Sequence, residues 1–289
     1  MNSSSPSPHE HGIDALLPQE IAEKAEAVGL QKARRDAVTL FVLGVLAGAF
    51  IALGAMFATT VLAGADGAIP FGVSRLLAGT VFALGLILVV VGGAELFTGN
   101  ALMVMALAAG KLRLSEMLRA WAIVYAGNFC GALGTALLVF LSGQYRIGGG
   151  QVAAAALDLA ARKAVLGLTE AFFLGILCNV LVCLAVWLSL GARTTTDKAV
   201  AIIFPVAAFV VAGFEHSVAN MYLLPLGLLI KAFAPASLAP VIAANAMLPD
   251  LTIGAFLLNL VVVTAGNIVG GGVLVGGVYW FVYLRTRPD

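Results

Sequence analysis

The chain has 289 residues, of which 61% are hydrophobic and 11% are charged, and its mean hydropathy is +1.04. Soluble domains carry about a quarter charged residues, so this chain lacks the polar surface that a water-soluble fold needs. The net charge of +1 gives no large field to recruit nucleic acid or acidic partners, and we expect no nucleic-acid binding.

Residues 1–36 differ in composition from the rest, and we predict that they form a cytoplasmic tail ahead of a membrane domain over residues 37–289. Between Pro18 and Arg35, apolar residues recur at helical spacing among acidic and basic ones. This pattern predicts a short amphipathic helix at the membrane surface or against a neighbouring subunit.

Six apolar segments follow the tail. A helix needs about 20 apolar residues to cross about 30 Å of hydrocarbon. The second and fifth segments are too long for simple spans and carry an acidic residue near the middle, which predicts a broken helix in each. The predicted segments are Val38–Leu62, Leu76–Ala109, Met117–Leu141, Ala164–Leu190, Ala199–Ile230 and Ile253–Tyr283.

Two short patterns occur twice in the same order. Residues 93–100 and 213–220 both read G-x-E-x-x-x-x-N, and residues 126–131 and 265–270 both read A-G-N-x-x-G. Polar, glycine-interrupted segments at matching places in two halves point to a transport site near the bilayer midplane. The sequence therefore predicts a membrane transporter or channel built from two copies of one unit.

The distribution of basic residues predicts the orientation of the chain. Cytoplasmic loops carry an excess of Lys and Arg, which places both termini in the cytoplasm. Six spans divide into two units of three, and a unit with an odd number of spans inserts in opposite orientations in its two copies. We therefore predict an inverted repeat whose two breaks meet near the bilayer centre. Eleven basic residues fall on the predicted inner side: Lys24, Lys32, Arg34, Arg35, Lys111, Arg113, Arg119, Arg193, Lys198, Arg285 and Arg287. Five fall on the predicted outer side: Arg75, Arg146, Arg162, Lys163 and Lys231.

The stretches 94–100, 213–221, 174–187 and 266–272 together resemble the signatures of the formate/nitrite transporter family. The resemblance implies an all-α, aquaporin-like six-helix protomer with an inverted 3+3 repeat, assembled as a homopentamer in the inner membrane. It also implies one pore per protomer for small monovalent anions and no cofactor. Formate is favoured because residues 214–220 resemble the formate-channel version, while nitrite and hydrosulfide remain alternatives.

His216 is the only histidine of the membrane portion, and it lies at the second break. Imidazole titrates near neutral pH and can exchange a proton with a weak acid. An apolar pore holds a bare anion poorly, so protonating the anion would remove that barrier. The alternative is a buried histidine bonded to backbone. By resemblance, Thr98 in the opposite break lies near this histidine; otherwise its hydroxyl bonds its own helix.

Further site residues rest on the resemblance. Asn267 matches a pore residue, and Lys163 matches a lysine that attracts anions at the outer mouth of the pore. The alternative for Lys163 is a side chain that only extends its charge to the membrane–water interface. Asn179 either lines the pathway or joins helices. Glu95 and Glu215 are expected to brace the breaks, since ionised carboxylates would repel an anion. Four apolar residues fall where the family narrows its pore: Phe82, Leu86, Val182 and Phe209. We expect no catalytic residue and no metal site.

Two functions of other classes compete with transport. A membrane-embedded enzyme would use Glu215 and His216 as an acid/base pair, although adjacent helical residues point about 100° apart. A scaffolding protein would have no reason to keep ionisable groups at two midspan breaks, where such groups are costly.

Overall fold

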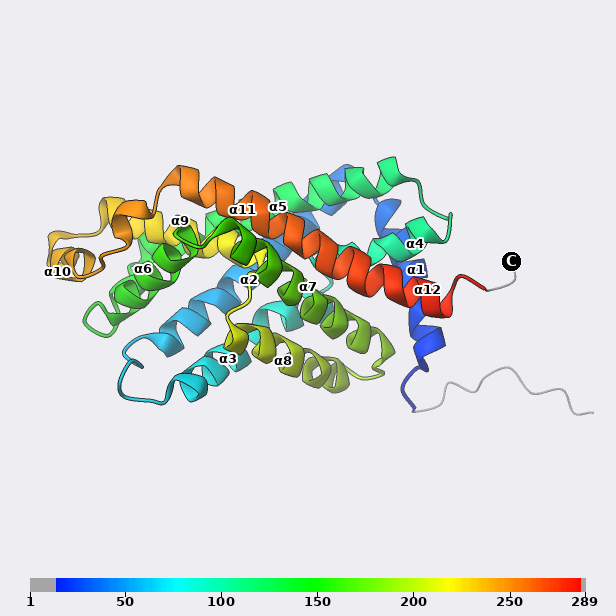
Figure 1. Cartoon of the computed structure of the whole chain (residues 1–289), viewed down its shortest axis with the longest axis horizontal. Coiled ribbons are helices and arrows are strands. Elements are labelled where there is room, and N and C mark those ends of the chain that lie inside the picture. The colour runs from blue at the N-terminus through cyan, green and yellow to red at the C-terminus, as the bar shows by residue number, and fades with distance from the viewer. Residues whose placement is uncertain (1–13, 287–289) are drawn as a thin grey trace, which may run out of the picture.

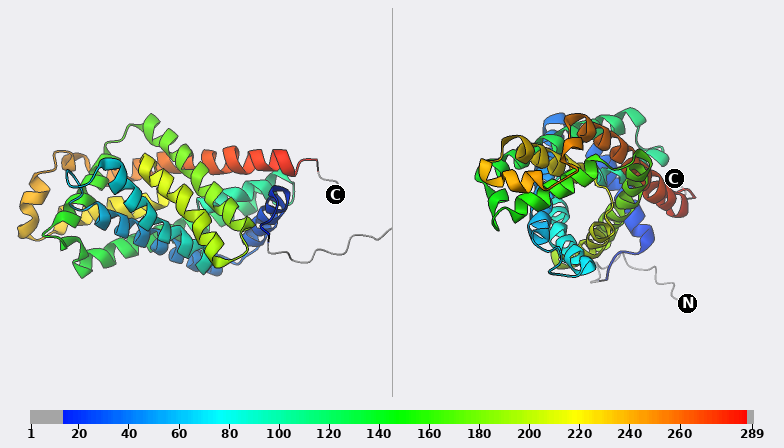
Figure 2. Two further views of the ribbon diagram at one scale, coloured as in Figure 1. Left: turned by 90° about the horizontal axis from the view of Figure 1, so that it is seen from below. Right: turned by 60° about the vertical axis from the view of Figure 1, so that its left-hand side comes forward.

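The computed structural model describes residues 14–286, and within that range it contains helices and no strand. Six of its helices are long and apolar enough to cross a membrane, as the sequence predicted. They are α2 (Ala37–Leu62), α3 (Phe71–Gly92), α5 (Leu114–Ser142), α7 (Leu168–Gly191), α8 (Thr195–Ala212) and a continuous final helix. That final helix comprises α11 (Ile253–Ile268), a π-helical stretch η5 (Val269–Gly277) and α12 (Val278–Tyr283), and it runs along the molecule in Figure 2.

Two broken helices complete the bundle. After α3, the chain resumes as η1 (Gly99–Met103) and α4 (Val104–Ala108), and after α8 it resumes as α9 (Ser217–Phe233). Gly93 and Gly213 end the first half-helices with φ of 79° and 73°, a left-handed conformation that glycine adopts without strain. Both predicted breaks are therefore confirmed.

The two halves pack alike. Helix α2 lies against α5 as α7 lies against α11, and α3 crosses α8 between them. Between α2 and α5, a Cβ on Gly131 would clash with the carbonyl oxygen of Val45. Between α7 and the final helix, a Cβ on Gly270 would clash with the carbonyl oxygen of Ile176. Small residues let membrane helices approach this closely. The inverted 3+3 repeat that the sequence predicted is confirmed.

Each half also has a short helix in front of its first span. Helix α1 (Pro18–Ala33) packs on η1, α4 and α7, while α6 (Gln151–Ala164) packs on α9 and α2. These partners correspond under the repeat, and Figure 1 shows α1 and α6 at opposite ends of the molecule. The amphipathic helix expected at the membrane surface or against a neighbouring subunit thus rests on its own protomer.

Some boundaries were predicted wrongly. The fourth span begins at Leu168 rather than Ala164, because α6 ends at Ala164 and Gly167 is extended before α7 starts in a new direction. The apolar run across residues 164–168 hid that change of direction. Four short helices lie in the segments that connect the predicted spans: η2 (Gln144–Arg146), η3 (Ala236–Leu238), α10 (Ala239–Ala243) and η4 (Leu248–Asp250).

Candidate functional site

The first break is held by Asn128, which projects from α5. Its Nδ2 donates to the carbonyl oxygens of Gly44 and Glu95, at 2.8 and 2.9 Å. Its Oδ1 accepts from the Phe97 backbone N–H at 2.9 Å. One buried amide thus satisfies two backbone groups of the break, which has no helix of its own to bond them, and ties the break to Gly44 on α2.

The second break is held in the same way by Asn267 on α11. Its Nδ2 donates to the carbonyl oxygens of Gly175 and Glu215, at 2.7 and 3.0 Å, and its Oδ1 accepts from Ser217 N–H at 2.9 Å. We expected Asn267 to line the pore; the three hydrogen bonds of its carboxamide all go to backbone groups. Its counterpart Asn128 received no role in the sequence analysis, although the repeated A-G-N-x-x-G pattern pairs the two.

The carboxylate of the first break faces two cations. Glu95 lies 3.0 Å from Lys32 Nζ and 2.8 Å from an Arg35 nitrogen, and it accepts from Asn100 Nδ2 at 2.9 Å. Lys32 also donates to Asn100 Oδ1 at 2.7 Å. We call Lys32, Arg35, Glu95 and Asn100 the α1-side cluster, because α1 and its C-terminal extension supply the cations.

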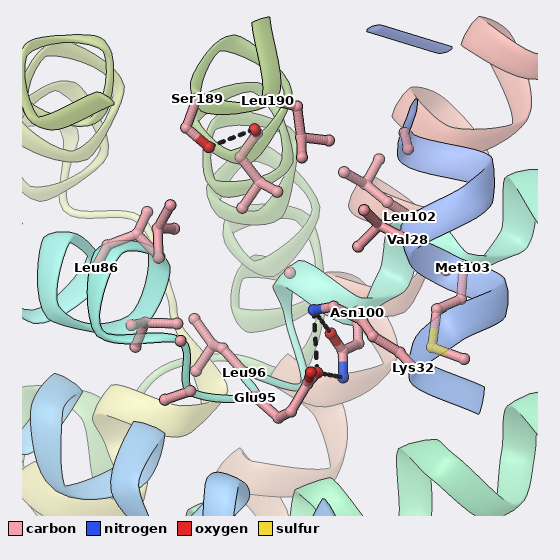
Figure 3. Close-up of a pocket in the computed structure, with 18 of the residues that line it drawn as sticks. Val28, Lys32, Leu86, Glu95, Leu96, Asn100, Leu102, Met103, Ser189 and Leu190 are labelled. Atoms are coloured by element: carbon pink, nitrogen blue, oxygen red, sulfur yellow. Dashed lines mark hydrogen bonds and ion pairs between the residues drawn. The ribbon is translucent and has the colours of Figure 1, made fainter. Parts of the chain in front are cut away.

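The α1-side cluster borders a cavity of about 210 Å³ between α1, the first break and the end of α7. Figure 3 shows Lys32, Glu95 and Asn100 joined at its floor, with Leu86, Leu96 and Leu190 among its apolar walls. One end of this cavity therefore carries net positive charge, and the rest is apolar.

The second break carries a matching arrangement, which we call the α6-side cluster. Glu215 lies 2.6 Å from Lys163 Nζ and accepts from Asn220 Nδ2 at 2.7 Å. Asn220 also donates to Asn259, whose Nδ2 donates in turn to the Lys163 carbonyl. The carboxylates of Glu95 and Glu215 are thus each held by at least one cation and an amide, and Lys163 projects from the last turn of α6 rather than from α7.

The two breaks meet through one hydrogen bond. Thr98 Oγ1 lies 2.9 Å from His216 Nε2, and both residues are buried. The other ring nitrogen, Nδ1, accepts from the Ala219 backbone N–H at 3.0 Å and so caps α9. Because a nitrogen that accepts carries no proton, a neutral His216 must carry its proton on Nε2 and donate it to Thr98. The Thr98 hydroxyl proton is then free for another acceptor.

Asn179 on α7 links the first break to α11. Its Nδ2 donates to the carbonyl oxygens of Thr98 and Asn267, at 3.2 and 2.6 Å, while its Oδ1 is buried and finds no partner among residues 14–286. The contacts match the interhelical alternative that the sequence left open.

Four apolar residues were expected to narrow the pore. Phe209 stacks on the His216 ring at 6.0 Å between ring centroids, and Phe82 packs edge-on against Phe209 at 5.6 Å. Leu86 lines the cavity beside the α1-side cluster, and Val182 is buried on α7. Phe209, backed by Phe82, thus covers one face of the His216 ring.

The geometry does not favour the enzyme alternative. The Glu215 carboxylate bonds Lys163 and Asn220, whereas the His216 ring bonds Thr98 and Ala219. The two side chains therefore diverge and have no common point at which to act as an acid/base pair.

Comparisons with known proteins agree with this arrangement. A family model described as formate/nitrite transporter matches residues 19–281. The chain is 44% identical to the formate channel FocA of Escherichia coli K12, covering 95% of this chain and 97% of that one. It is 42% identical to FocA of Haemophilus influenzae over 91% of this chain and 93% of the relative.

Solved structures show the same fold. A pentameric formate channel with formate bound superposes with a TM-score of 0.81 at 45% identity, covering 86% of this chain and 98% of that one. A second structure, described as an FNT family ion channel, gives a TM-score of 0.77 at 29% identity, with 91% and 98% covered. These relatives are channels and transporters rather than enzymes. The chain is a multi-pass membrane protein that belongs to the formate/nitrite transporter family.

Proposed function

We propose that the protein conducts formate and related small monovalent anions across the inner membrane, through one pore in each protomer of a homopentamer. The observation that carries this proposal is the hydrogen bond between His216 and Thr98, where two opposed breaks meet inside an apolar body. The similarity to FocA and to a pentameric formate channel supports the substrate and the assembly.

The pathway runs between the two charged clusters. An anion enters past Lys163 from the α6 side, which the charge distribution of the loops makes the outer side, and leaves past Lys32 on the α1 side. Both termini then lie in the cytoplasm. Phe82 and Phe209 narrow the path on one side of His216 and Leu86 narrows it on the other, so water is excluded while the anion passes.

His216 offers the anion a proton donor at the centre of the path. Its Nε2–H turns from Thr98 to an anion oxygen, and the free Thr98 hydroxyl donates to the same ion. Two donors replace part of the lost hydration, whose removal costs several kcal/mol per ion. A neutral ring that lost this proton would become an imidazolate, so transfer requires the doubly protonated imidazolium; if that form gives its Nε2 proton to the anion, the ring becomes neutral, the anion leaves as the neutral acid and the passage becomes formate/proton symport.

The Ala219 N–H restricts how His216 is recharged. While Nδ1 accepts from the Ala219 N–H, the ring holds one proton, and it can donate a hydrogen bond but not act as an acid toward formate. A doubly protonated ring has to give up the α9 cap. Proton coupling in this protein therefore requires Nδ1 to release Ala219 N–H and stay protonated, while Nε2 gives its proton to the anion and regains one from the pathway side.

The test is a substrate panel with purified protein in proteoliposomes. Labelled formate, nitrite and hydrosulfide are offered with and without an imposed pH gradient, and native mass spectrometry in mild detergent counts the subunits. Protein-dependent movement of unconverted formate and five copies per particle support the proposal. A stable monomer, or flux no greater than that of empty liposomes for every anion, refutes it.

A further inference from the structure

The charges of the α1-side cluster do not cancel. Lys32 and Arg35 both form ion pairs with Glu95, so two cations face one carboxylate and leave a net charge of +1. An anion arriving there meets attraction even while Glu95 is ionised.

At the other break, the residues related by the repeat do not give the same excess of positive charge. Lys163 precedes the first residue of α7 by five positions, as Lys32 precedes that of α2, so the two lysines correspond. By the same register, the counterpart of Arg35 is Leu166, which carries no charge. Glu215 and Lys163 alone would cancel each other.

Arg75 supplies the missing charge from a different place in the fold. It lies near the start of α3, and its Nη2 donates to the carbonyl oxygen of Val210 in the last turn of α8, at 2.6 Å. A Cβ on Gly213 would lie 3.4 Å from the same nitrogen, so the guanidinium is at the entrance to the second break. Two charges act on the guanidinium: that of Arg162, which repels it, and that of Glu215, which attracts it.

The guanidinium of Arg75 retains unused donors. Its Nε is buried and has no acceptor among the described residues. Leaving a buried donor without an acceptor is costly, and an anion that accepts from it would recover that cost. The guanidinium edge presents two parallel N–H groups, which match the two oxygens of a carboxylate or a nitrite ion.

We propose that Arg75 is an anion-binding residue of the α6-side mouth that selects planar two-oxygen anions, formate and nitrite, over hydrosulfide. It gives this mouth the second cation that Arg35 gives the other. A hydrosulfide ion has one acceptor atom and cannot use both N–H groups. This role rests on the proposed passage of small anions. Arg75 lies on α3, which belongs to the first half of the chain, so the repeated motifs of the second half do not include it.

A cation at the C-terminal end of α8 would also stabilise that helix through its dipole, and the experiment must separate the two roles. Arg75→Lys keeps the charge and a donor for Val210 but loses the two-donor edge. Arg75→Gln removes the charge. The matched control is Arg146→Gln, an exposed arginine on the same predicted side whose guanidinium contacts Tyr145 and lies outside the cluster. Thermal unfolding of each purified variant checks the fold.

Half-saturating concentrations and maximal rates are measured for formate, nitrite and hydrosulfide in proteoliposomes. For Arg75→Lys, we expect the half-saturating concentration to rise about tenfold for formate and nitrite, because one charge-assisted hydrogen bond is lost. For hydrosulfide, we expect it to stay within about twofold of the wild-type value. Arg75→Gln should raise all three values, and Arg146→Gln should change none.

Two results would overturn the proposal. One is an unchanged half-saturating concentration for formate in Arg75→Lys, which would leave Arg75 as a helix cap; the other is an equal change for all three anions. Should Arg75→Gln fail to fold, Arg75→Lys still decides. A wild-type protein that moves no anion refutes the proposed function instead, before any variant is compared.

Discussion

Asn128 and Asn267 hold the two breaks with the same three hydrogen bonds, although they stand on helices of opposite membrane orientation. Each donates twice to carbonyl oxygens, once to the facing span and once to the glutamate of its break, and each accepts once from a backbone N–H within or directly after the break. Irregular backbone at this depth persists only when its polar groups are paired, so these two amides make the breaks possible.

Replacing either asparagine by leucine should therefore have the same effect. Asn128→Leu and Asn267→Leu each leave two buried backbone groups at the break without a partner, and each unsatisfied group costs about 1–3 kcal/mol. We expect both variants to unfold at lower temperature than wild type in detergent and to lose flux. If one variant matches wild type in both measurements, the symmetric bracing role fails for that residue.

Lys163 forms an ion pair with Glu215, and in our proposal it also attracts anions; the two roles can be separated. Lys163→Gln leaves the buried Glu215 without its cation, and breaking a buried pair is destabilising by about 3–5 kcal/mol. The double variant Lys163→Gln with Glu215→Gln removes both charges and should recover most of the stability. We expect it to keep a raised half-saturating concentration for formate, measured in proteoliposomes.

Two further variants test the attraction by charge alone. Lys163→Arg should keep most of the flux, and Lys163→Glu should lose much of it, less so at high salt because the Debye length falls to about 3 Å at 1 M. Equal flux in wild type and both variants would mean that Lys163 merely reaches for the interface.

The repeated motifs made much of this site predictable. They located both breaks and the glutamate in each, because the same backbone problem is solved twice with the same residues, whereas the nearness of Thr98 to His216 was implied by the resemblance to the family. Lys32 was missed, although it stands at the same distance before its span as Lys163 does. Comparing the two halves position by position would have found it.

Other features follow from packing that no pattern records. Helix α6 was hidden because hydropathy measures composition and not direction. Arg75 could be placed on one side of the membrane by the charge distribution, but its approach to Val210 depends on how α3 crosses α8. Asn267 was assigned to the pore because resemblance identifies a position and not where its donors point.

Asp36 should make the start of α2 sensitive to acid. Its side chain accepts from Thr39 N–H, and hydrogen bonding by the Thr39 side chain, and then by its backbone, lowers the pKa of the Asp36 carboxyl below its ordinary value. The sign follows from linkage: the cap contributes above the ordinary pKa and is lost as the pH falls through the lowered one. Hydrogen exchange at Thr39, corrected for its intrinsic pH dependence, should accelerate only in strong acid. Asp36→Asn keeps an acceptor without titrating near that pH, and its protection should not follow the same curve.

His216 is the group on which proton-coupled transport turns in our proposal, and its contacts define the variant that tests it. Asn at position 216 can still cap α9, because its side-chain oxygen accepts from the Ala219 N–H, but it does not titrate near neutral pH. We expect His216→Asn to pass formate as a membrane current while losing proton-coupled uptake. His216→Phe has neither a cap nor a donor and should abolish uptake, and Thr98→Ala should only weaken it. Labelled-formate flux and current are measured together from about pH 5 to pH 8. If His216→Asn keeps the wild-type pH dependence of coupled uptake, His216 gives no proton, and its role reduces to donating a hydrogen bond and capping α9.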